Sequence, residues 1–477
     1  MSTTSDHPTP GPQARAPWNH ALVIGLGRSG LAAVDLLVGL GVRVRGYDAR
    51  ESIEGLPVDL STFLGMPQPP DAAFEGIDLL VLSPGVPPQE IRRRAERLAP
   101  SAAIHGELSL AMHLVCFGGQ PQWPAVPTVL VTGTNGKSTV TALTGALLQA
   151  DGRHPFVGGN LGVPLCERLL ETLRGAQWID SLVLECSSYQ LETLPPVPTD
   201  VAMIINVTPD HLDRYASMEE YARTKARIFG GLGATGLALL DADDEWTDRL
   251  APPEGSGQPS EIPTGAWVAR VGDPKTAVVE DDGAAQQLVL YQAEKYPRSS
   301  LRIAGGHNAR NALFALLAAR HLGVSAEACQ RGLERFEGLP HRMVRVRELD
   351  GVVYYDDSKA TNVTSALAGL RGLERPFVLI AGGLSKGDDL TPLREVLARQ
   401  GRGLVAVGKA AEEFAAMAEG VVPVVRAGLM DDAVPKARAL AKHGEAVVLA
   451  PACASFDQYK SYAQRGEMFT AAVLGLE

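Results

Sequence analysis

Short apolar runs alternate with amphipathic stretches rich in Ala and Leu along almost the whole chain. This alternation of strand-like and helix-like patterns is typical of βαβ units and parallel sheets. The first predicted strands cover residues 20–25, 42–48 and 78–85, and they end in Gly, Asp and Ser-Pro-Gly. Such residues suit the carboxyl edge of an open sheet, where folds of this class bind ligands.

Two further series of strands follow, separated by stretches that predict boundaries. A Pro- and Gly-rich stretch at 117–127 predicts a linker. The polar, turn-rich region 251–300 predicts small antiparallel strands and surface loops, and a helix is predicted over 307–323. FEGLPHR at 336–342 marks the next boundary, after which residues 351–452 repeat the alternation.

The predicted fold class is therefore α/β with three domains. A tail at 1–18, rich in Pro, Ser and Thr, is expected to be disordered. The pattern predicts an N-terminal Rossmann-like domain at 19–118 and a C-terminal Rossmann-like domain at 339–477. Between them, at 119–338, it predicts a central P-loop ATPase-type α/β domain with a small antiparallel sheet.

The composition is typical of a globular protein and argues against several classes of partner. Its 477 residues exceed a single core, and 45% of them are hydrophobic while 21% are charged. The net charge of −11 disfavours nucleic acid or an anionic membrane as the main partner. The five cysteines form no CxxC pair, and no apolar run approaches the ~20 residues that span a bilayer. We therefore expect a cytoplasmic protein with reduced thiols and with neither a nucleic-acid nor a membrane partner.

A GxGxxG sequence is formed by Gly25, Gly27 and Gly30, directly after a predicted strand and at the start of a helix. Glycines here permit a tight turn and a close approach of backbone N–H groups to a phosphate. Asp48 ends the next strand, where its carboxylate can accept hydrogen bonds from a ribose or a base. The motif predicts a nucleotide or dinucleotide site, conventionally one for NAD. The alternative is that the glycines serve only the packing of helix on strand.

A strand, a glycine loop and a helix are predicted for TVLVTGTNGKSTVTALTGALL. Gly133 and Gly136 let successive amides face phosphate oxygens, and Lys137 can reach the β- and γ-phosphates. The Ser138 hydroxyl can bind Mg²⁺. The ordinary spacing of such loops would place glycine where this chain has Val131, so the loop is a shortened variant. It predicts binding of a nucleoside triphosphate.

Three further residues follow predicted strands or lie on a helix after them. Glu185 ends the apolar run SLVLE, the usual place for a Mg²⁺ ligand beside a phosphate loop, although a carboxylate there can also cap the next helix. His211, in NVTPDHLDRY, can bind a metal or serve only structure. Lys225 lies in the charged helix EEYARTKARIF, and this local pattern predicts a solvated surface lysine.

The chain resembles the Mur ligase family, the ATP-dependent amino-acid ligases of peptidoglycan synthesis, in TGTNGKST, LECSS, NVTPDHLDRY, GGHNARNA and GLPHR. The resemblance runs from about residue 20 to the C-terminus. DDSKATN at 356–362 and PACASFDQYKSYAQRG at 451–466 are similar to the member that adds D-glutamate. The resemblance therefore implies ligation of D-glutamate to UDP-N-acetylmuramoyl-L-alanine through an acyl phosphate.

The resemblance also implies roles for individual residues. The uridine diphosphate and muramoyl-alanine parts of the substrate would contact Arg28, Ser29, Asp48, Gly85 and Asn160. ATP would contact Gly133, Thr134, Asn135, Gly136, Lys137, Ser138, Thr139, Asn308, Asn311, Arg342 and Asp357. Two Mg²⁺ ions would be held by Ser138, Glu185, His211 and Lys225, the last as a carbamate. D-Glutamate would contact Lys359, Thr361, Lys386, Ser455 and Tyr462. The catalytic residues would be Lys137, His211, Lys225 and Lys359.

Two features remain open at this stage. The family often has Phe where this chain has Tyr462, and a contact through the ring would change the affinity for D-glutamate. The residue that removes the proton from the amine is not indicated by the sequence. The expected partners are small molecules only, and we expect a monomer.

Three other functions each leave part of the sequence unexplained. A folylpolyglutamate synthetase shares the phosphate loop and the acyl-phosphate chemistry but gives no reason for the first GxGxxG. An NAD-dependent dehydrogenase or regulator leaves the phosphate loop unexplained. A structural ATPase switch leaves the third domain unexplained.

Overall fold

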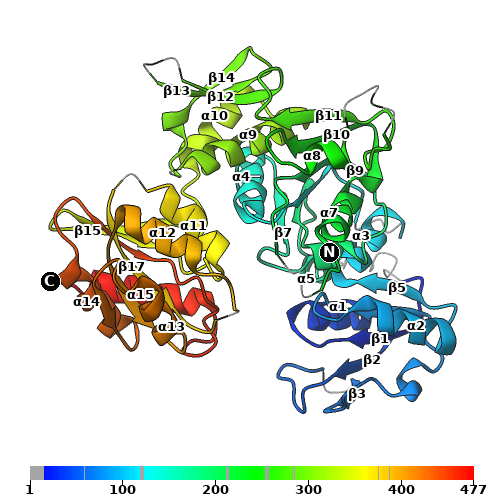
Figure 1. The fold of residues 1–477 in the computed structure, drawn as a ribbon. Coiled ribbons are helices and arrows are strands. Elements are labelled where there is room, and N and C mark those ends of the chain that lie inside the picture. The colour runs from blue at the N-terminus through cyan, green and yellow to red at the C-terminus, as the bar shows by residue number, and fades with distance from the viewer. Residues whose placement is uncertain are drawn as a thin grey trace, which may run out of the picture. The chain divides into compact units, whose positions relative to one another are not determined.

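The computed structural model describes residues 16–57, 60–118, 123–210, 214–252, 256, 258–281, 283, 285–303, 305–373, 375–385 and 387–477. Among these residues the strands form three sheets of five, nine and six strands, and helices connect most of the parallel strands (Figure 1). The predicted α/β class is therefore confirmed. None of the helices in this part of the chain combines the length and apolarity needed to cross a bilayer.

The N-terminal sheet is entirely parallel, with strand order β3-β2-β1-β4-β5. Its strands are β1 (His20–Ile24), β2 (Arg43–Asp48), β3 (Ser61–Leu64), β4 (Leu79–Leu82) and β5 (Ala103–Gly106). The helices of this part are α1 (Arg28–Gly39), α2 (Pro88–Leu98) and α3 (Glu107–Cys116). Because β1 lies between β2 and β4, the strand order reverses beside β1, where open sheets bind their ligands.

The central sheet has the order β14-β13-β12-β11-β10-β9-β6-β8-β7 in the described chain. Its strands are β6 (Thr128–Thr132), β7 (Pro155–Gly159), β8 (Ser181–Glu185), β9 (Thr199–Ile204), β10 (Leu232–Asp241), β11 (Trp267–Val271), β12 (Ala277–Asp281), β13 (Gln286–Leu290) and β14 (Glu294–Pro297). Its helices are α4 (Lys137–Ala150), α5 (Leu165–Leu173), α6 (Ser188–Leu191), α7 (Met218–Ala226), α8 (Thr247–Leu250), α9 (Gly306–His321) and α10 (Ala326–Arg335). β6 and β8 are buried at every residue, as interior parallel strands require.

The region 251–300 differs in part from the expectation of small antiparallel strands. β11 pairs in parallel with β10 along its whole length and in parallel with β12 at Val271 and Ala277. The expected antiparallel pairing is therefore wrong for β11. The turn-rich composition indicated short strands, but strand direction depends on the partner, which local composition does not encode.

The C-terminal sheet has the order β15-β16-β20-β17-β18-β19. Its strands are β15 (Val344–Leu349), β16 (Val352–Asp356), β17 (Phe377–Gly382), β18 (Gly401–Val407), β19 (Val424–Arg426) and β20 (Ala446–Leu449). Its helices are α11 (Val363–Arg371), α12 (Thr391–Gln400), α13 (Ala411–Ala418), α14 (Met430–Leu440) and α15 (Tyr462–Leu474). Only β15 is antiparallel to its neighbour among these described pairs.

The chain divides into two compact units. The first takes in the chain up to Glu280 with Leu288–Lys295 and Leu313–Gly332, and the second comprises Asp281–Gln287, Tyr296–Ala312 and Leu333–Glu477. The first two sheets thus belong largely to one unit, and the predicted boundary between their domains stays a prediction.

One hydrophobic core runs through the first unit and joins the first two sheets. It contains residues of both sheets, from Trp18 to Ile262. Glu107, at the start of α3, accepts the N–H of Cys166 in α5 at 2.7 Å. Trp18 is buried beside His105 and His113, so the predicted tail at 1–18 extends too far at its end.

Candidate active site

The phosphate loop lies between β6 and α4, as the sequence predicted. Gly136 adopts φ 85° immediately before α4, a left-handed conformation that favours glycine. The Lys137 ammonium donates to the carbonyl oxygens of Gly133 and Thr134, at 2.9 Å each. Ser138 is buried in the first turn of α4. The lysine thus lies folded back over its own loop.

Asn206 holds this loop from the end of β9. Its side-chain oxygen accepts the N–H groups of Thr134 at 3.1 Å and Asn135 at 2.8 Å, and its amide nitrogen donates to the Asn135 carbonyl at 3.0 Å. The Thr134 hydroxyl donates to the Thr208 carbonyl and accepts the Thr208 N–H. Two amides of the loop that precedes α4 are therefore bonded to Asn206. Sequence reasoning quoted Asn206 without giving it a role.

Lys225 is buried, with 1% of its surface exposed. Its side-chain nitrogen donates to the Gly133 carbonyl at 2.9 Å and lies 4.4 Å from the centre of the Tyr221 ring. Burial lowers the pKa of Lys225 well below its usual value, and the positive charge of Lys137 lowers it further. The prediction of a solvated surface lysine is therefore wrong. The charged helix α7 buries this lysine together with Tyr221, Ala222 and Ala226, and only the family resemblance pointed to it.

Glu185 ends β8 and is 3% exposed. Its Oε1 accepts the side-chain N–H of Asn160 at 2.7 Å, while its Oε2 is buried with no hydrogen-bond partner in the described part of the chain. A buried carboxylate oxygen without a donor fits a hard cation such as Mg²⁺. The described residues hold no cluster of three or more His, Cys, Asp or Glu side chains around a metal position. His211 lies outside the described residues.

A cavity of about 320 Å³ lies at the carboxyl edge of the N-terminal sheet, lined by Gly25, Asp48 and Gly85 among others. Asp48 is buried and accepts the Leu26 N–H at 2.8 Å, so it supports the GxGxxG turn. Hydrogen bonds from the Arg50 side chain hold the pKa of Asp48 well below its usual value. The carboxylate is therefore ionised at neutral pH.

The three glycines of this turn have different roles. A Cβ at Gly30 would lie 1.9 Å from the Gly25 carbonyl oxygen, so Gly30 serves close packing. A Cβ at Gly27 would meet nothing within 4 Å, which leaves the turn open at that point. The Arg28 side chain donates to the Gly162 carbonyl at 2.8 Å and is thereby directed away from the turn. Ser29 follows in the first turn of α1.

The second unit contains the other residues expected at ATP. Asn311 donates to the side-chain oxygen of Asn308 at 3.2 Å within α9. Asp357 follows β16, is 6% exposed and accepts the Met343 N–H at 3.2 Å. Burial raises the pKa of Asp357 to about 8, and the charge of Arg342 opposes this rise.

The residues expected at D-glutamate gather on loops after the central strands of the C-terminal sheet. Lys359, after β16, donates to the Tyr462 hydroxyl at 3.1 Å and lies 4.7 Å from the centre of that ring. Ser455, after β20, is buried, and Thr361 donates its N–H to the Lys359 carbonyl. The hydroxyl that distinguishes Tyr462 from Phe therefore has a partner. Lys386 lies outside the described residues.

Arg465 was missed by sequence reasoning and organises these loops. It is 2% exposed, and its guanidinium donates to the Ser358 hydroxyl and carbonyl and to the Cys453 carbonyl, at 2.8–3.1 Å. Ser358 in turn donates to the Tyr462 carbonyl at 2.8 Å. The loops after β16 and β20 are thus fixed to the start of α15 by one buried cation.

Family models match all three parts of the chain. The Mur ligase MurD-like N-terminal domain matches residues 19–98, the Mur ligase middle domain residues 131–319, and the Mur ligase glutamate ligase domain residues 341–453. The chain belongs to the Mur ligase family. It is therefore an amide-forming ligase, as the sequence predicted.

Within the family, similar curated relatives share one name. The UDP-N-acetylmuramoylalanine–D-glutamate ligase of Myxococcus xanthus is 40% identical over 461 residues, which cover 95% of this chain and 98% of the relative. The enzyme of the same name from Nitrosospira multiformis is 37% identical over 470 residues, covering 96% and 95%.

Solved structures support the fold. The UDP-N-acetylmuramate–alanine ligase MurC of Thermotoga maritima matches with a TM-score of 0.59 at 17% identity, over 96% of this chain and 99% of that one. The MurF ligase of the same organism, solved in complex with ADP, matches with a TM-score of 0.58 at 17% identity, over 96% and 95%. At this identity the likeness bears on the fold alone.

Proposed function

We propose that the chain uses ATP to join D-glutamate to the L-alanyl carboxylate of UDP-N-acetylmuramoyl-L-alanine. The observation that carries this proposal is that one compact unit has two separate nucleotide-type sites. These are the phosphate loop before α4 and the cavity of about 320 Å³ at the GxGxxG turn. An NAD enzyme would use the second and leave the first without a role. The names of the relatives supply the two substrates.

ATP would be held by the phosphate loop, and four residues later in the chain are proposed as further ATP contacts. The triphosphate would lie at the N-terminus of α4, which begins at Lys137 and attracts anions. Lys137 would leave the carbonyls of its own loop and bind the β- and γ-phosphates. The loop contacts would come from Gly133, Thr134, Asn135, Gly136, Lys137, Ser138 and Thr139. Asn308 and Asn311 would contact adenine, and Arg342 and Asp357 the phosphate and ribose.

Mg²⁺ would be held by Glu185 and the Ser138 hydroxyl, with His211 and a carbamate on Lys225. The unpartnered Oε2 of Glu185 supports this assignment. Bound Mg²⁺ supplies neutralisation of phosphoryl charge. Lys225 supports it as well, because its lowered pKa favours the neutral amine, which is the form that reacts with CO₂. The neutral amine forms the carbon–nitrogen bond to CO₂ and loses one proton, so the side chain becomes an anion.

The nucleotide sugar would occupy the cavity at the GxGxxG turn. Because the Arg28 side chain is directed to Gly162, the backbone amides of Arg28 and Ser29 would face the diphosphate. Asp48 and Gly85 would contact the uridine part from the cavity wall, and Asn160 the muramoyl-alanine part. D-Glutamate would be contacted by Lys359, Thr361, Lys386, Ser455 and Tyr462.

The reaction would proceed in two displacements. A carboxylate oxygen of the substrate attacks the γ-phosphorus, the bond to the bridging oxygen breaks, and ADP leaves. The D-glutamate amine then attacks the acyl carbon, loses a proton, and expels inorganic phosphate. Lys137 and Lys359 would stabilise the negative charge on phosphoryl and carbonyl oxygens.

The test is phosphate release by the purified full chain. Release is expected only when UDP-N-acetylmuramoyl-L-alanine, ATP, Mg²⁺ and D-glutamate are all present. Equal turnover with L-lysine or diaminopimelate, or turnover without a nucleotide sugar, would refute the proposal. All five cysteines are free thiols, which suits the cytoplasm, and the proposal includes a monomer, to be checked by sedimentation.

A further inference from the structure

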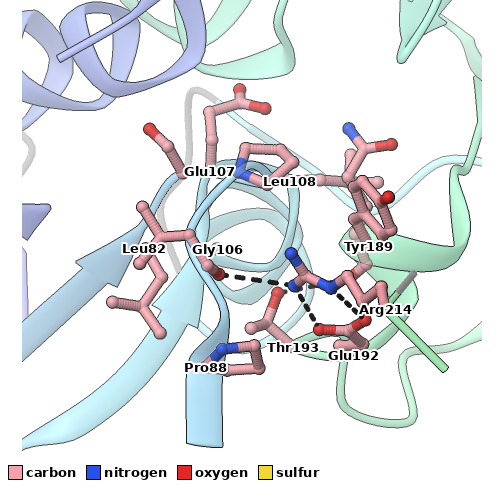
Figure 2. A pocket seen from close by; sticks show the side chains of 13 residues that line it. Leu82, Pro88, Gly106, Glu107, Leu108, Tyr189, Glu192, Thr193 and Arg214 are labelled. Atoms are coloured by element: carbon pink, nitrogen blue, oxygen red, sulfur yellow. Dashed lines mark hydrogen bonds and ion pairs between the residues drawn. The ribbon is translucent and has the colours of Figure 1, made fainter. Parts of the chain in front are cut away.

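One ion pair of the first unit joins segments that are far apart in the sequence. Arg214 donates to both carboxylate oxygens of Glu192, from Nε at 3.0 Å and from Nη2 at 2.6 Å. The two side chains are only 14% and 12% exposed, and Figure 2 shows them facing each other with Tyr189 beside the guanidinium. The Tyr215 hydroxyl donates to the same carboxylate at 2.7 Å, and the Tyr189 ring centre lies 4.2 Å from the guanidinium carbon. A bidentate ion pair with these neighbours fixes the orientation of the guanidinium as well as its distance from the carboxylate.

The same pair also holds the N-terminal part of the chain. Arg214 Nη2 donates to the Val86 carbonyl at 3.4 Å, and Arg92 of α2 donates to the Glu192 carbonyl at 3.1 Å. The space around these groups is about 10 Å³, lined by residues including Ser83, Gly106 and Thr193 (Figure 2). That volume is at the lower limit for one water. The junction is therefore a closed contact and not a ligand site.

Each side of this junction faces one of the two proposed nucleotide sites. Gly85, Val86 and Pro87 line the cavity of about 320 Å³, so Val86 lies between that cavity and Arg214. On the other side, the ring of Tyr215, the residue after Arg214, lies 5.2 Å from the ring of Tyr221 in α7. The Tyr221 hydroxyl lies 3.3 Å from the Thr134 hydroxyl of the phosphate loop.

We propose that Arg214, held by Glu192, is a positioning residue that couples occupancy of the cavity at Gly85 to occupancy of the phosphate loop. A ligand in the cavity fixes the segment around Val86, and the Val86–Arg214 bond, long at 3.4 Å, then fixes Arg214 and its neighbour Tyr215. Tyr215 packs against Tyr221, whose hydroxyl lies beside that of Thr134 in the phosphate loop. Coupling of this kind is reciprocal, since each ligand must favour the other by the same factor. The identities of the two ligands rest on the proposed function.

The experiment measures that factor by calorimetry on the full chain. The dissociation constant of UDP-N-acetylmuramoyl-L-alanine is determined with and without Mg²⁺ and the non-hydrolysable ATP analogue AMPPCP. For the wild type we expect a ratio of at least about fivefold, the low end of typical coupling. In Arg214→Met the ratio is expected to fall to within about twofold of unity, while each ligand still binds alone. Arg214→Lys, which keeps the charge without the bidentate ion pair, is expected to lie between.

The control is Arg320→Met, which removes another half-buried ion pair of the same unit, with Glu294 at 2.9 Å. It is expected to keep the wild-type ratio. If Arg214→Met does not fold, the coupling ratio is measured in Glu192→Gln instead, because this variant keeps the shape of the side chain and removes its charge. A wild-type ratio of unity, or an unchanged ratio in the folded variants, overturns the coupling role. Failure of the wild type to bind the nucleotide sugar at all would instead refute the proposed function.

Discussion

Burial moves the pKa of Lys225 down and that of Asp357 up, and each shift sets the chemistry of its side chain. The lowered pKa of Lys225 favours the neutral amine beside the Gly133 carbonyl, which is the form that reacts with CO₂. Asp357 is kept protonated up to about pH 8 when no ligand is bound. A shift of one pKa unit corresponds to about 1.4 kcal/mol between the two protonation states. Both pKa shifts therefore lead to predictions that would not hold for an exposed lysine or aspartate.

Lys225→Ala is expected to lose most activity, because it removes both the amine and the anion formed from it. Acetate or propionate is expected to restore part of the activity by supplying a carboxylate in the vacated space. Phosphate release, measured with and without these acids, checks this. The matched control is Arg223→Ala on the exposed face of α7, which is expected to behave like the wild type. Full activity of Lys225→Ala, or an unmodified ammonium in a high-resolution map at neutral pH, would contradict the carbamate.

Asp357→Asn is expected to change how stability depends on pH. The folded pKa of Asp357 is raised to about 8 from 3.8, so between those values the folded chain binds more protons than the unfolded chain. Its contribution to the free energy of unfolding is then fully favourable below about pH 4 and declines as pH rises towards 8. The asparagine variant lacks this decline. Its melting temperature, relative to that of the wild type, is therefore expected to rise between pH 5 and pH 8. Parallel curves of melting temperature against pH for the two proteins would show that the aspartate is not protonated.

At the scale of elements, the strands and the phosphate loop could be predicted because their signals are local. The apolar run of β6, the glycines after it and the helix α4 follow one another in the sequence. Asn206 and Arg465 could not be given their roles in this way. Their hydrogen bonds span 71 residues to Asn135 and 107 residues to Ser358, and only the folded chain brings these partners together. The burial of Lys225 belongs to the same group, since it depends on how α7 lies against the loop.

Asn206 is expected to control ATP use through the shape of the phosphate loop. Asn206→Ala removes three side-chain hydrogen bonds to Thr134 and Asn135. A net loss of about 2 kcal/mol for these bonds corresponds to roughly a 30-fold fall in kcat/KM for ATP. Steady-state kinetics with ATP as the varied substrate measure the effect.

Two further variants sharpen this test. Asn206→Asp keeps the acceptor oxygen but turns the donor into a second acceptor facing the Asn135 carbonyl, so it is expected to recover little activity. Asn19→Ala removes a hydrogen bond to Asp78 in the N-terminal sheet and is expected to leave the ATP kinetics unchanged. Equal kcat/KM for ATP in Asn206→Ala and the wild type would show that the loop keeps its shape without this side chain.

In the whole molecule, the proposed ligand sites are distributed over different parts of the chain. The N-terminal cavity and the phosphate loop belong to one compact unit with a continuous core. The adenine, ribose and D-glutamate contacts are assigned to the other unit. A variant that damages one site should therefore leave the binding of another site's ligand, measured with that ligand alone, largely intact.

Lys137→Ala tests this division directly. Turnover is expected to fall by roughly 10²–10³-fold, because a positioned charge at the phosphoryl group is worth about 3–4 kcal/mol in the transition state. Binding of UDP-N-acetylmuramoyl-L-alanine alone, measured by calorimetry, is expected to stay within about twofold of the wild type, and NAD is expected not to bind. The Lys137 ammonium donates to the loop carbonyls of Gly133 and Thr134, and the N-terminal cavity is lined by other residues, so the substitution leaves the cavity wall unchanged. A kcat within about threefold of the wild type corresponds to less than ~1 kcal/mol and would remove Lys137 from the chemistry. Loss of nucleotide-sugar binding in the same variant would show that the two ligands share one site. Tight NAD binding would show that the GxGxxG turn binds NAD, its conventional ligand, and not the nucleotide sugar.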